Sequence, residues 1–252
     1  MTQGFYEILS NVTIAKDIYE MVLGGDTSAI TAPGQFINIK VEGFYLRRPI
    51  SICDWDEKTI TILFKTVGEG TQRLSEMKVG EKLDILVGLG NGFDVNACGE
   101  SPLLVGGGIG TPPMLPLAQA YGEKATVITG FRSANAVILQ EDFRKTGAET
   151  ILCTDDGTMG VHGFVTQPLE ECLKNGGVDA IFACGPMPML KGIAALAAQY
   201  NVPLCEVSLE ERMACGVGAC LGCACKVKRN DEEYFLHVCK NGPVFNAEEV
   251  VW

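Results

Sequence analysis

The chain has 252 residues, a length that allows one large domain or two to three smaller ones. Apolar residues make up 47% and charged residues 20%, which is typical of a core-forming globular protein and excludes a disordered one. The net charge of −11 argues against binding to nucleic acid, because broad contact with phosphates requires dense lysine and arginine.

The N-terminal segment has no basic stretch followed by an apolar run, so we expect no secretory signal. Uninterrupted apolar stretches stay below the roughly 18 residues of a membrane span. These observations predict a protein of the reducing cytoplasm. In that compartment eleven cysteines are better explained by metal binding or buried free thiols than by disulfides.

Residues 1–98 are expected to be all-β. Segments rich in β-branched residues, separated by Gly, Asp and Glu clusters, predict strands at 36–41, 49–54, 59–67 and 82–89. Apart from a short turn near residues 72–77, the pattern indicates no helix here. Several short strands at this spacing are typical of a small barrel or sandwich.

Between about residue 99 and residue 207, strands alternate with helices. Strands are predicted at 103–108, 125–131, 149–156 and 180–185, and helices at 112–121, 142–147, 165–177 and 188–200. This alternation implies a parallel sheet with helices on its faces. Residues 208–252 form a cysteine-rich tail. The tail is too short to build a stable core alone, so we expect a bound metal to stabilise its fold.

Four cysteines of the tail have the spacing of a plant-type [2Fe–2S] site. Cys215, Cys220 and Cys223 form C-x4-C-x2-C, and Cys239 follows 16 residues after Cys223. Glycines in the loop would let backbone N–H groups approach a cluster without Cβ clashes. These glycines are Gly216, Gly218 and Gly222.

A structural zinc site is the alternative, because four cysteines suit tetrahedral zinc. Zinc ribbons usually carry two C-x2-C knuckles, and the second is missing here. Cys225, two residues after Cys223 on a predicted strand, is interpreted as a buried free thiol. Free buried cysteine is common, so the scattered cysteines are assigned no function. They are Cys53, Cys98, Cys153, Cys172 and Cys205.

A glycine-rich turn joins the first strand and helix of the α/β part. Gly106, Gly108, Gly110 and Pro113 form G-x-G-x-G-x-x-P, which differs from the G-x-G-x-x-G dinucleotide fingerprint. Backbone N–H groups and a helix N-terminus there still favour a pyrophosphate. Cys184-Gly185-Pro186 ends a later strand, at the edge where open α/β sheets bind ligands. Each motif taken alone is also consistent with a plain turn.

Two segments of the β-rich part suit phosphate and ring binding. The arginines of Arg47-Arg48-Pro49-Ile50-Ser51 can make bidentate phosphate contacts, and Ser51 can hydrogen-bond a ring carbonyl or a phosphate. Gly68-Glu69-Gly70-Thr71 offers a nest of N–H groups and a hydroxyl. Either segment alone could equally be a solvated surface.

In combination these motifs resemble the ferredoxin reductase superfamily. Arg48–Ser51 is similar to its flavin-binding R-x-Y-S motif, with Ile50 in place of the usual aromatic residue, which puts ring stacking from that position in doubt. Gly70-Thr71 resembles its flavin-phosphate loop, and the two α/β motifs resemble its pyridine-nucleotide motifs. The cysteine tail narrows the resemblance to electron-transfer subunits of type B dihydroorotate dehydrogenases, over essentially all 252 residues.

The resemblance implies three parts: an antiparallel FAD-binding β-barrel (1–98), an NAD-binding α/β parallel-sheet domain (99–207) and a small [2Fe–2S] domain (208–252). FAD would be held by Arg48, Pro49, Ile50 and Ser51, flanked by Leu63, Phe64 and Lys65, with Gly70 and Thr71 at its phosphates. NAD would use Gly106, Gly108, Gly110, Thr111, Cys184, Gly185 and Pro186. The cluster would use Cys215, Cys220, Cys223 and Cys239.

The resemblance also implies a partner. An FMN-containing catalytic subunit would oxidise dihydroorotate, in pyrimidine biosynthesis and in a heterotetramer of two copies of each chain. Electrons would pass from it through the cluster and FAD to NAD⁺. This chain shows no dihydroorotate site or acid–base pair of its own, and its only histidines, His162 and His237, are interpreted as structural.

Other interpretations stay open. The rival within the enzymes is a flavin/iron–sulfur subunit of a ferredoxin–NADP reductase or sulfide dehydrogenase complex. A rival of another class is a non-enzymatic, zinc-stabilised nucleotide-binding protein. NAD is preferred over NADP from the resemblance alone, since Arg132-Ser133 could hold a 2′-phosphate or form a solvated turn.

Overall fold

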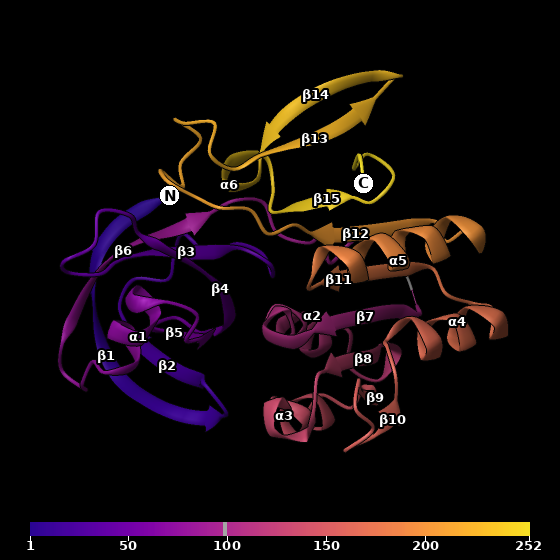
Figure 1. Cartoon of the computed structure of the whole chain (residues 1–252), viewed down its shortest axis with the longest axis horizontal. Coiled ribbons are helices and arrows are strands. Elements are labelled where there is room, and N and C mark those ends of the chain that lie inside the picture. Colours follow the sequence, from indigo (N-terminus) through magenta and orange to yellow (C-terminus); the bar gives the residue numbers. More distant parts are fainter. Residues whose placement is uncertain (98–99) are drawn as a thin grey trace.

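The computed structural model describes residues 1–97 and 100–252, so Cys98 and the predicted domain boundary at residues 98 and 99 lie outside the described residues. Across the described residues the chain forms a closed six-stranded barrel, a seven-stranded sheet flanked by helices, and a C-terminal hairpin (Figure 1). This architecture confirms the predicted fold class. No helix in these two stretches is long and apolar enough to cross a bilayer.

The barrel is antiparallel, with strands in the order β1-β2-β5-β4-β3-β6. Its elements are β1 (Thr2–Ala15), β2 (Ile18–Gly24), β3 (Phe36–Lys40), β4 (Arg48–Trp55), β5 (Thr59–Lys65), α1 (Glu69–Ser75) and β6 (Lys82–Leu89). Alternating side chains fill the interior, which is rich in isoleucine, for example Ile39, Ile52 and Ile62. The sequence predicts neither β1 nor β2 individually, because much of β1 is exposed and lacks a sustained apolar pattern.

The second layer is a sheet in the order β10-β9-β8-β7-β11-β12-β15, parallel except for β15. Its first six strands are β7 (Pro102–Gly107), β8 (Thr126–Phe131), β9 (Glu149–Thr154), β10 (Val161–His162), β11 (Ala180–Cys184) and β12 (Leu204–Ser208). The helices are α2 (Met114–Tyr121), α3 (Gln140–Lys145), α4 (Thr166–Asn175) and α5 (Met187–Gln199), with short 3₁₀ turns η1 (Gly108–Gly110), η2 (Gly122–Lys124) and η3 (Ala134–Ala136).

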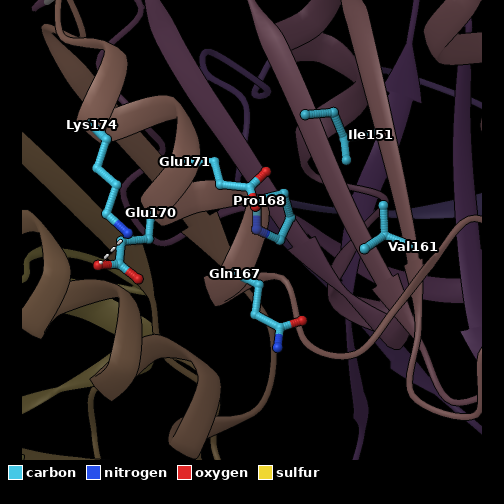
Figure 2. Close-up of a pocket in the computed structure, with 7 residues that line it drawn as sticks. All are labelled: Ile151, Val161, Gln167, Pro168, Glu170, Glu171 and Lys174. Carbon is cyan, nitrogen blue, oxygen red and sulfur yellow. Dashed lines mark ion pairs between the residues drawn. The ribbon is translucent and has the colours of Figure 1, made fainter.

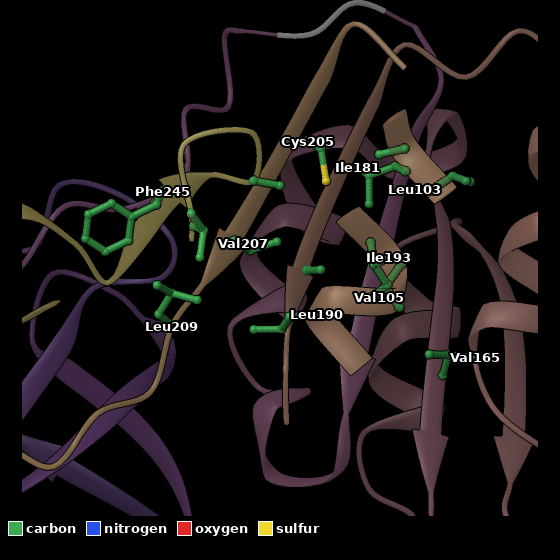
Figure 3. Packing of buried hydrophobic residues seen from close by; sticks show 14 of the residues in the cluster. Leu103, Val105, Val165, Ile181, Leu190, Ile193, Cys205, Val207, Leu209 and Phe245 are labelled. Atoms are coloured by element: carbon green, nitrogen blue, oxygen red, sulfur yellow. The ribbon is translucent and has the colours of Figure 1, made fainter. Parts of the chain in front are cut away.

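Helix α5 shows how local sequence sets an element of this layer. Pro188 lies in the first turn, where a missing N–H costs no intrahelical hydrogen bond. The Ala- and Leu-rich sequence that follows has high helix propensity. One face of the helix buries Leu190 and Ile193 in the sheet core, and left-handed Asn201 lies just beyond its end (Figure 3).

The tail contains β13 (Ala224–Arg229), β14 (Glu232–His237), α6 (Val238–Asn241) and β15 (Val244–Asn246). Strand β15 pairs antiparallel with β12, with Phe245 opposite Val207. Phe245 therefore packs into the same apolar core as Leu209 and Leu190 (Figure 3). The tail thus folds against the sheet core, which explains how so short a segment buries enough apolar surface.

Replacing the buried Phe245 ring tests how much the packing of the tail on the sheet core contributes to stability. Phe245→Ala should lower the free energy of unfolding by about 3–5 kcal/mol, because it removes a large side chain from a packed core. Phe235→Ala is the matched control in the same tail, since that ring is exposed, and should change stability by less than about 0.5 kcal/mol. Urea unfolding of both variants measures the difference, and equal effects would contradict the shared core.

Candidate cofactor-binding sites

Arg48 joins the two segments predicted to bind the flavin. Its guanidinium carbon lies 4.9 Å from the centroid of the Phe44 ring, and its Nη1 donates a hydrogen bond to the Leu46 carbonyl. A Cβ added to Gly70 would stand 2.2 Å from Arg48 Nε. The predicted arginine and the predicted phosphate loop therefore lie in contact, and the contact depends on glycine at position 70.

The neighbouring Arg47 has a different role. Its Nη2 forms an ion pair with Asp84 Oδ1 at 2.9 Å, and its Nη1 donates to the Asp84 carbonyl at 2.9 Å. Burial favours the neutral form of Asp84, but hydrogen bonds from Gln3 and Arg47 outweigh it and hold the pKa of Asp84 below its usual value. Arg47 thus fastens β4 to β6, while Arg48 faces the predicted flavin-phosphate loop.

Some of the remaining predicted flavin residues point into the barrel core, and others are accessible to solvent. Ile50 and Phe64 pack in the barrel core, where the Phe64 ring stacks on Tyr19 with centroids 5.6 Å apart. Pro49 and Ser51 alternate with Ile50 along β4 and stay partly accessible, and Lys65 is exposed. Leu63 belongs to a buried cluster with Met114 of α2, so it lies where the barrel meets the α/β part.

The hydroxyl of Thr71 closes the turn before α1. Its Oγ1 accepts hydrogen bonds from the Val67 N–H at 2.9 Å and the Gly68 N–H at 3.2 Å. It also donates to the Gly68 carbonyl at 3.0 Å. Thr71 therefore shapes the loop that carries Gly70. Its hydroxyl already makes these hydrogen bonds within the loop before any phosphate binds.

The two predicted nucleotide motifs touch each other backbone to backbone. Cys184 of β11 pairs with Gly106 of β7, which brings both strand ends to the same edge of the sheet. A Cβ on Gly110 would stand 2.7 Å from the Cys184 carbonyl oxygen, and one on Gly185 would stand 3.1 Å from the Gly107 Cα. Glycine is required because no larger residue fits between these strand ends.

Thr111 supplies an observation that points to a bound group. Its side chain is fully buried, and among residues 1–97 and 100–252 its Oγ1 has no hydrogen-bond partner. Such an unpaired buried hydroxyl costs about 1–3 kcal/mol, so a polar ligand beside it would be stabilising. This fits a nucleotide at the loop.

Cys184, in contrast, is an unreactive thiol. Burial raises the pKa of Cys184 to about 12. The hydrogen bond with Ser208 acts in the opposite direction but is the smaller effect. A thiol with this pKa is neutral at physiological pH, so Cys184 serves the site through its backbone.

The predicted flavin and nucleotide segments are adjacent in space. Strand β5 contacts the η1 turn, and helix α2 contacts β4. Gln119 of α2 also donates a hydrogen bond to Asp54 Oδ2 of β4 at 3.2 Å. A flavin on the barrel and a nicotinamide at η1 would therefore share one interface.

Backbone N–H groups of the cysteine loop point at sulfur, as the glycine pattern predicts. Cys215 Sγ accepts from the N–H groups of Val217, Ala219 and Cys220 at 3.5, 3.3 and 3.4 Å. Cys239 Sγ accepts from the Gly218 N–H at 3.1 Å. Gly218 has φ of 77°, a conformation that glycine adopts without strain, and this opens the loop around the sulfurs.

The four thiols are arranged as two pairs. The Cys220 side chain helps to lower the pKa of Cys215, and the Cys223 side chain helps to raise the pKa of Cys239, so each of these two cysteines interacts with one neighbouring cysteine. Within residues 1–97 and 100–252, no three His, Cys, Asp or Glu side chains converge as ligands of one ion. Two sulfurs per iron is what a dinuclear cluster requires, whereas a structural zinc requires four ligands around one point. The donor set therefore fits [2Fe–2S] better than zinc.

Cys215 and Cys239 differ in their acidity. Burial opposes ionisation of Cys215, but hydrogen bonds from Val217 and Cys220 outweigh it and lower its pKa to about 6. Burial, together with the hydrogen bond to Cys223, raises the pKa of Cys239 to about 12. Cys215 lies partly at the surface and Cys239 is buried, so the loop offers a thiolate at Cys215 before Cys239 is deprotonated.

Other residues singled out in the sequence lie away from these sites. Cys225 is buried in apolar surroundings that raise its pKa to about 11, which agrees with a free thiol. Arg132 is exposed, and the Ser133 hydroxyl donates to Asn135 Oδ1 at 2.6 Å. Figure 2 shows a cavity over α4 and the β9–β10 edge, lined by Ile151, Val161, Gln167, Pro168, Glu170, Glu171 and Lys174, and none of these is a predicted site residue.

Asn38 of β3 is a buried polar residue that the sequence patterns did not indicate. It is 1% exposed and its side chain abuts Gly216 of the cysteine loop. The signal in the sequence was a single amide inside the apolar run FINIK.

Comparisons with known proteins identify the family. Residues 210–251 match the family model of the iron-sulfur cluster binding domain of dihydroorotate dehydrogenase B. The dihydroorotate dehydrogenase B (NAD(+)), electron transfer subunit, of Caldanaerobacter subterraneus subsp. tengcongensis is 43% identical, over 97% of each chain. The protein of that name from Geobacillus sp. (strain WCH70) is 42% identical, over 100% of this chain and 99% of its own. The chain belongs to this family of electron transfer subunits.

Solved structures agree with this assignment. The chain resembles the NADH-dependent reduced ferredoxin-NADP oxidoreductase structure with a TM-score of 0.86 and 29% identity, over 99% of this chain and 90% of that one. The ferredoxin reductase in carbazole 1,9a-dioxygenase has a TM-score of 0.67 at 22% identity, over 79% and 65%, and shows the fold alone. Family and fold confirm the predicted oxidoreductase subunit and its cofactors: FAD, [2Fe–2S] and NAD. The individual cofactor-binding residues stay predictions.

Substituting Gly70, with Gly68 as the control, tests the predicted contact of Arg48 with the flavin phosphates. Gly70→Ala places a methyl group on Arg48 and forces its flexible guanidinium away, with little effect on the fold. Loss of its charged hydrogen bonds costs about 1.5–3 kcal/mol, so the Kd for FAD should rise roughly tenfold to a hundredfold. Gly68→Ala is the control, because an added Cβ there meets nothing within 4 Å. Fluorescence titration with FAD measures both, and equal affinities would contradict the predicted contact.

Proposed function

We propose that this chain carries electrons between a dihydroorotate-oxidising partner subunit and NAD⁺, through a [2Fe–2S] cluster and an FAD that it holds itself. The observation that carries the proposal is the full-length similarity to dihydroorotate dehydrogenase B electron transfer subunits, together with a loop whose four cysteines are paired two by two. When bound, the cluster handles single electrons, the nicotinamide takes a hydride, and the flavin exchanges both.

The chain's own residues would bind and align these groups. Arg48, beside Gly70, would hold the FAD phosphates, and Pro49, Ile50 and Ser51 would position the ring, with Leu63, Phe64 and Lys65 alongside and Thr71 shaping the phosphate loop. Gly106, Gly108, Gly110, Thr111, Cys184, Gly185 and Pro186 would bind NAD. Cys215, Cys220, Cys223 and Cys239 would hold the cluster. The corresponding domains are residues 1–98, 99–207 and 208–252.

The proposal includes a separate subunit for the oxidation of dihydroorotate. An FMN-containing catalytic chain, in a cytoplasmic heterotetramer of two copies of each chain, fits a protein whose relatives are named as electron transfer subunits. The relatives' name specifies NAD(+), so NAD is the acceptor proposed.

A second function is favoured by one observation. The solved structure matching 99% of this chain at 29% identity is an NADH-dependent reduced ferredoxin-NADP oxidoreductase, so a ferredoxin-linked complex is the alternative. The two differ in what delivers electrons from outside the chain. The native complex, purified with its co-purifying chain, should reduce NAD⁺ with dihydroorotate as the donor.

The assay distinguishes the two functions by using both donors. Reduction of NAD⁺ by dihydroorotate, without added ferredoxin, supports the proposal. Failure with dihydroorotate in an intact, fully loaded complex, combined with turnover of reduced ferredoxin and NADP⁺, would overturn it in favour of the alternative. A colourless, iron-free protein that contains zinc would overturn both.

Cys220 and Cys225, five residues apart, form a matched pair for testing the cluster ligands. Cys220→Ala removes one thiolate of a proposed ligand pair, so iron and acid-labile sulfide should fall at least about tenfold, because the remaining three thiolates cannot complete both irons. Cys225→Ala removes a buried thiol outside that set and should retain the wild-type iron content. Iron and sulfide analysis, with the visible spectrum, measures both variants. Iron loss in Cys225→Ala alone would contradict the assignment.

A further inference from the structure

Asn38 is a polar residue placed between the flavin barrel and the cluster loop. Its neighbours Ile37 and Ile39 face the barrel core, so alternation turns Asn38 to the outside of the barrel. On that outer face it is nevertheless buried, and it lies opposite Pro49, a predicted flavin residue. The preceding outward residue, Phe36, belongs to the core that the sheet shares with the tail.

The cluster loop is what covers Asn38. A Cβ on Gly216 would stand 2.2 Å from Asn38 Nδ2, so the amide lies directly against the residue that follows Cys215. Gly216 is buried and has φ of 70°, and both its conformation and this contact require glycine. The amide of a barrel strand therefore reaches the loop whose N–H groups surround Cys215 Sγ.

The side-chain amide of Asn38 has no hydrogen-bond partner in the part of the chain that the structure describes. Neither its Nδ2 nor its Oδ1 makes a hydrogen bond, although both are buried. Buried polar groups are nearly always satisfied, and an exception at a ligand-binding loop points to a bound group as the partner. Asn11 differs from Asn38 in its donor: the Asn11 Oδ1 is also buried without a partner, but its Nδ2 donates to the Leu74 and Met77 carbonyls at 3.0 and 2.9 Å.

We propose that Asn38 is a positioning residue for the cluster: its Nδ2–H donates into the sulfur environment of Cys215 and ties the cluster loop to the flavin barrel. The inference rests on the proposed function, since it requires a cluster on the four cysteines. A hydrogen bond to sulfur stabilises the more negative, reduced cluster and raises its reduction potential. Asn38 would thereby fix the position of the loop beside the barrel and raise the reduction potential of the cluster.

The test replaces the amide by an apolar side chain of similar size. In the loaded native complex, Asn38→Leu should lower the equilibrium constant for one-electron reduction of the cluster about tenfold, which is a downward shift of about 59 mV. A redox titration followed by electron paramagnetic resonance measures the potential, and the cluster signal should change shape. In the metal-free chain the same variant should unfold at an equal or higher urea concentration, because the lost amide had no partner there.

Asn11→Leu is the matched control. It removes an amide that does bond within the barrel, so it should lower the urea midpoint of the metal-free chain and leave the cluster potential unchanged. A purely structural Asn38 would behave like Asn11. If Asn38→Leu does not yield folded complex, the isosteric Asn38→Asp replaces the donor by an acceptor and should lower the potential at least as far.

The outcomes separate this inference from the function on which it rests. Iron-free wild-type protein would overturn the proposed function. A loaded wild-type complex together with unchanged potential and unchanged resonance signal in Asn38→Leu or Asn38→Asp would overturn the role of Asn38 alone.

Discussion

The pairing of β15 with β12 is the interaction on which the arrangement of this protein depends. It adds a strand from the tail to the edge of the sheet and inserts Phe245 into the sheet core. The chain just before β15 also bonds to the barrel side, where the Asn91 amide side chain donates to the Asn241 carbonyl at 2.8 Å. The cysteine loop, drawn in orange in Figure 1, is thereby held between two larger bodies, against the outer face of the barrel at Asn38. Electron transfer over short distances requires this rigidity, because it fixes one redox group relative to the next.

The three sites share one structural device, which is close approach at a glycine. Gly70 admits the Arg48 guanidinium, Gly110 admits the end of β11, and Gly216 admits the Asn38 amide. In each case one segment contributes the glycine and a segment distant in sequence contributes the group that fills the space. A motif search finds the glycines, because each lies in a recognisable loop. The partner groups are found only in the folded chain, and they determine which side chain serves a site and which serves the scaffold.

Arg47 and Arg48 illustrate what the sequence could predict and what it could not. Both arginines suit phosphate, and their order along the chain cannot separate them. In the fold, Asp84 of β6 engages Arg47, and Arg48 is left to face Gly70. Strands β7, β8, β9 and β11 and the four helices of the α/β part were predicted within a few residues, since each carries an apolar pattern bounded by glycine or proline. Strands β10 and β12 of the same sheet were not predicted. Strands β1 and β15 were not predicted, because β1 is largely exposed and β15 is only three residues long.

The sequence by itself determined the fold class, the cluster spacing and the family, because these depend on local periodicity and on fixed intervals between residues. Four cysteines at plant-type spacing specify a ligand set wherever the loop is placed. Tertiary structure decided which sulfurs pair, which arginine faces the loop, where the tail finds its core, and that Asn38 meets Gly216. Those outcomes join residues as far apart as 38 and 216, and contacts over such separations depend on how whole layers pack, which no local pattern encodes.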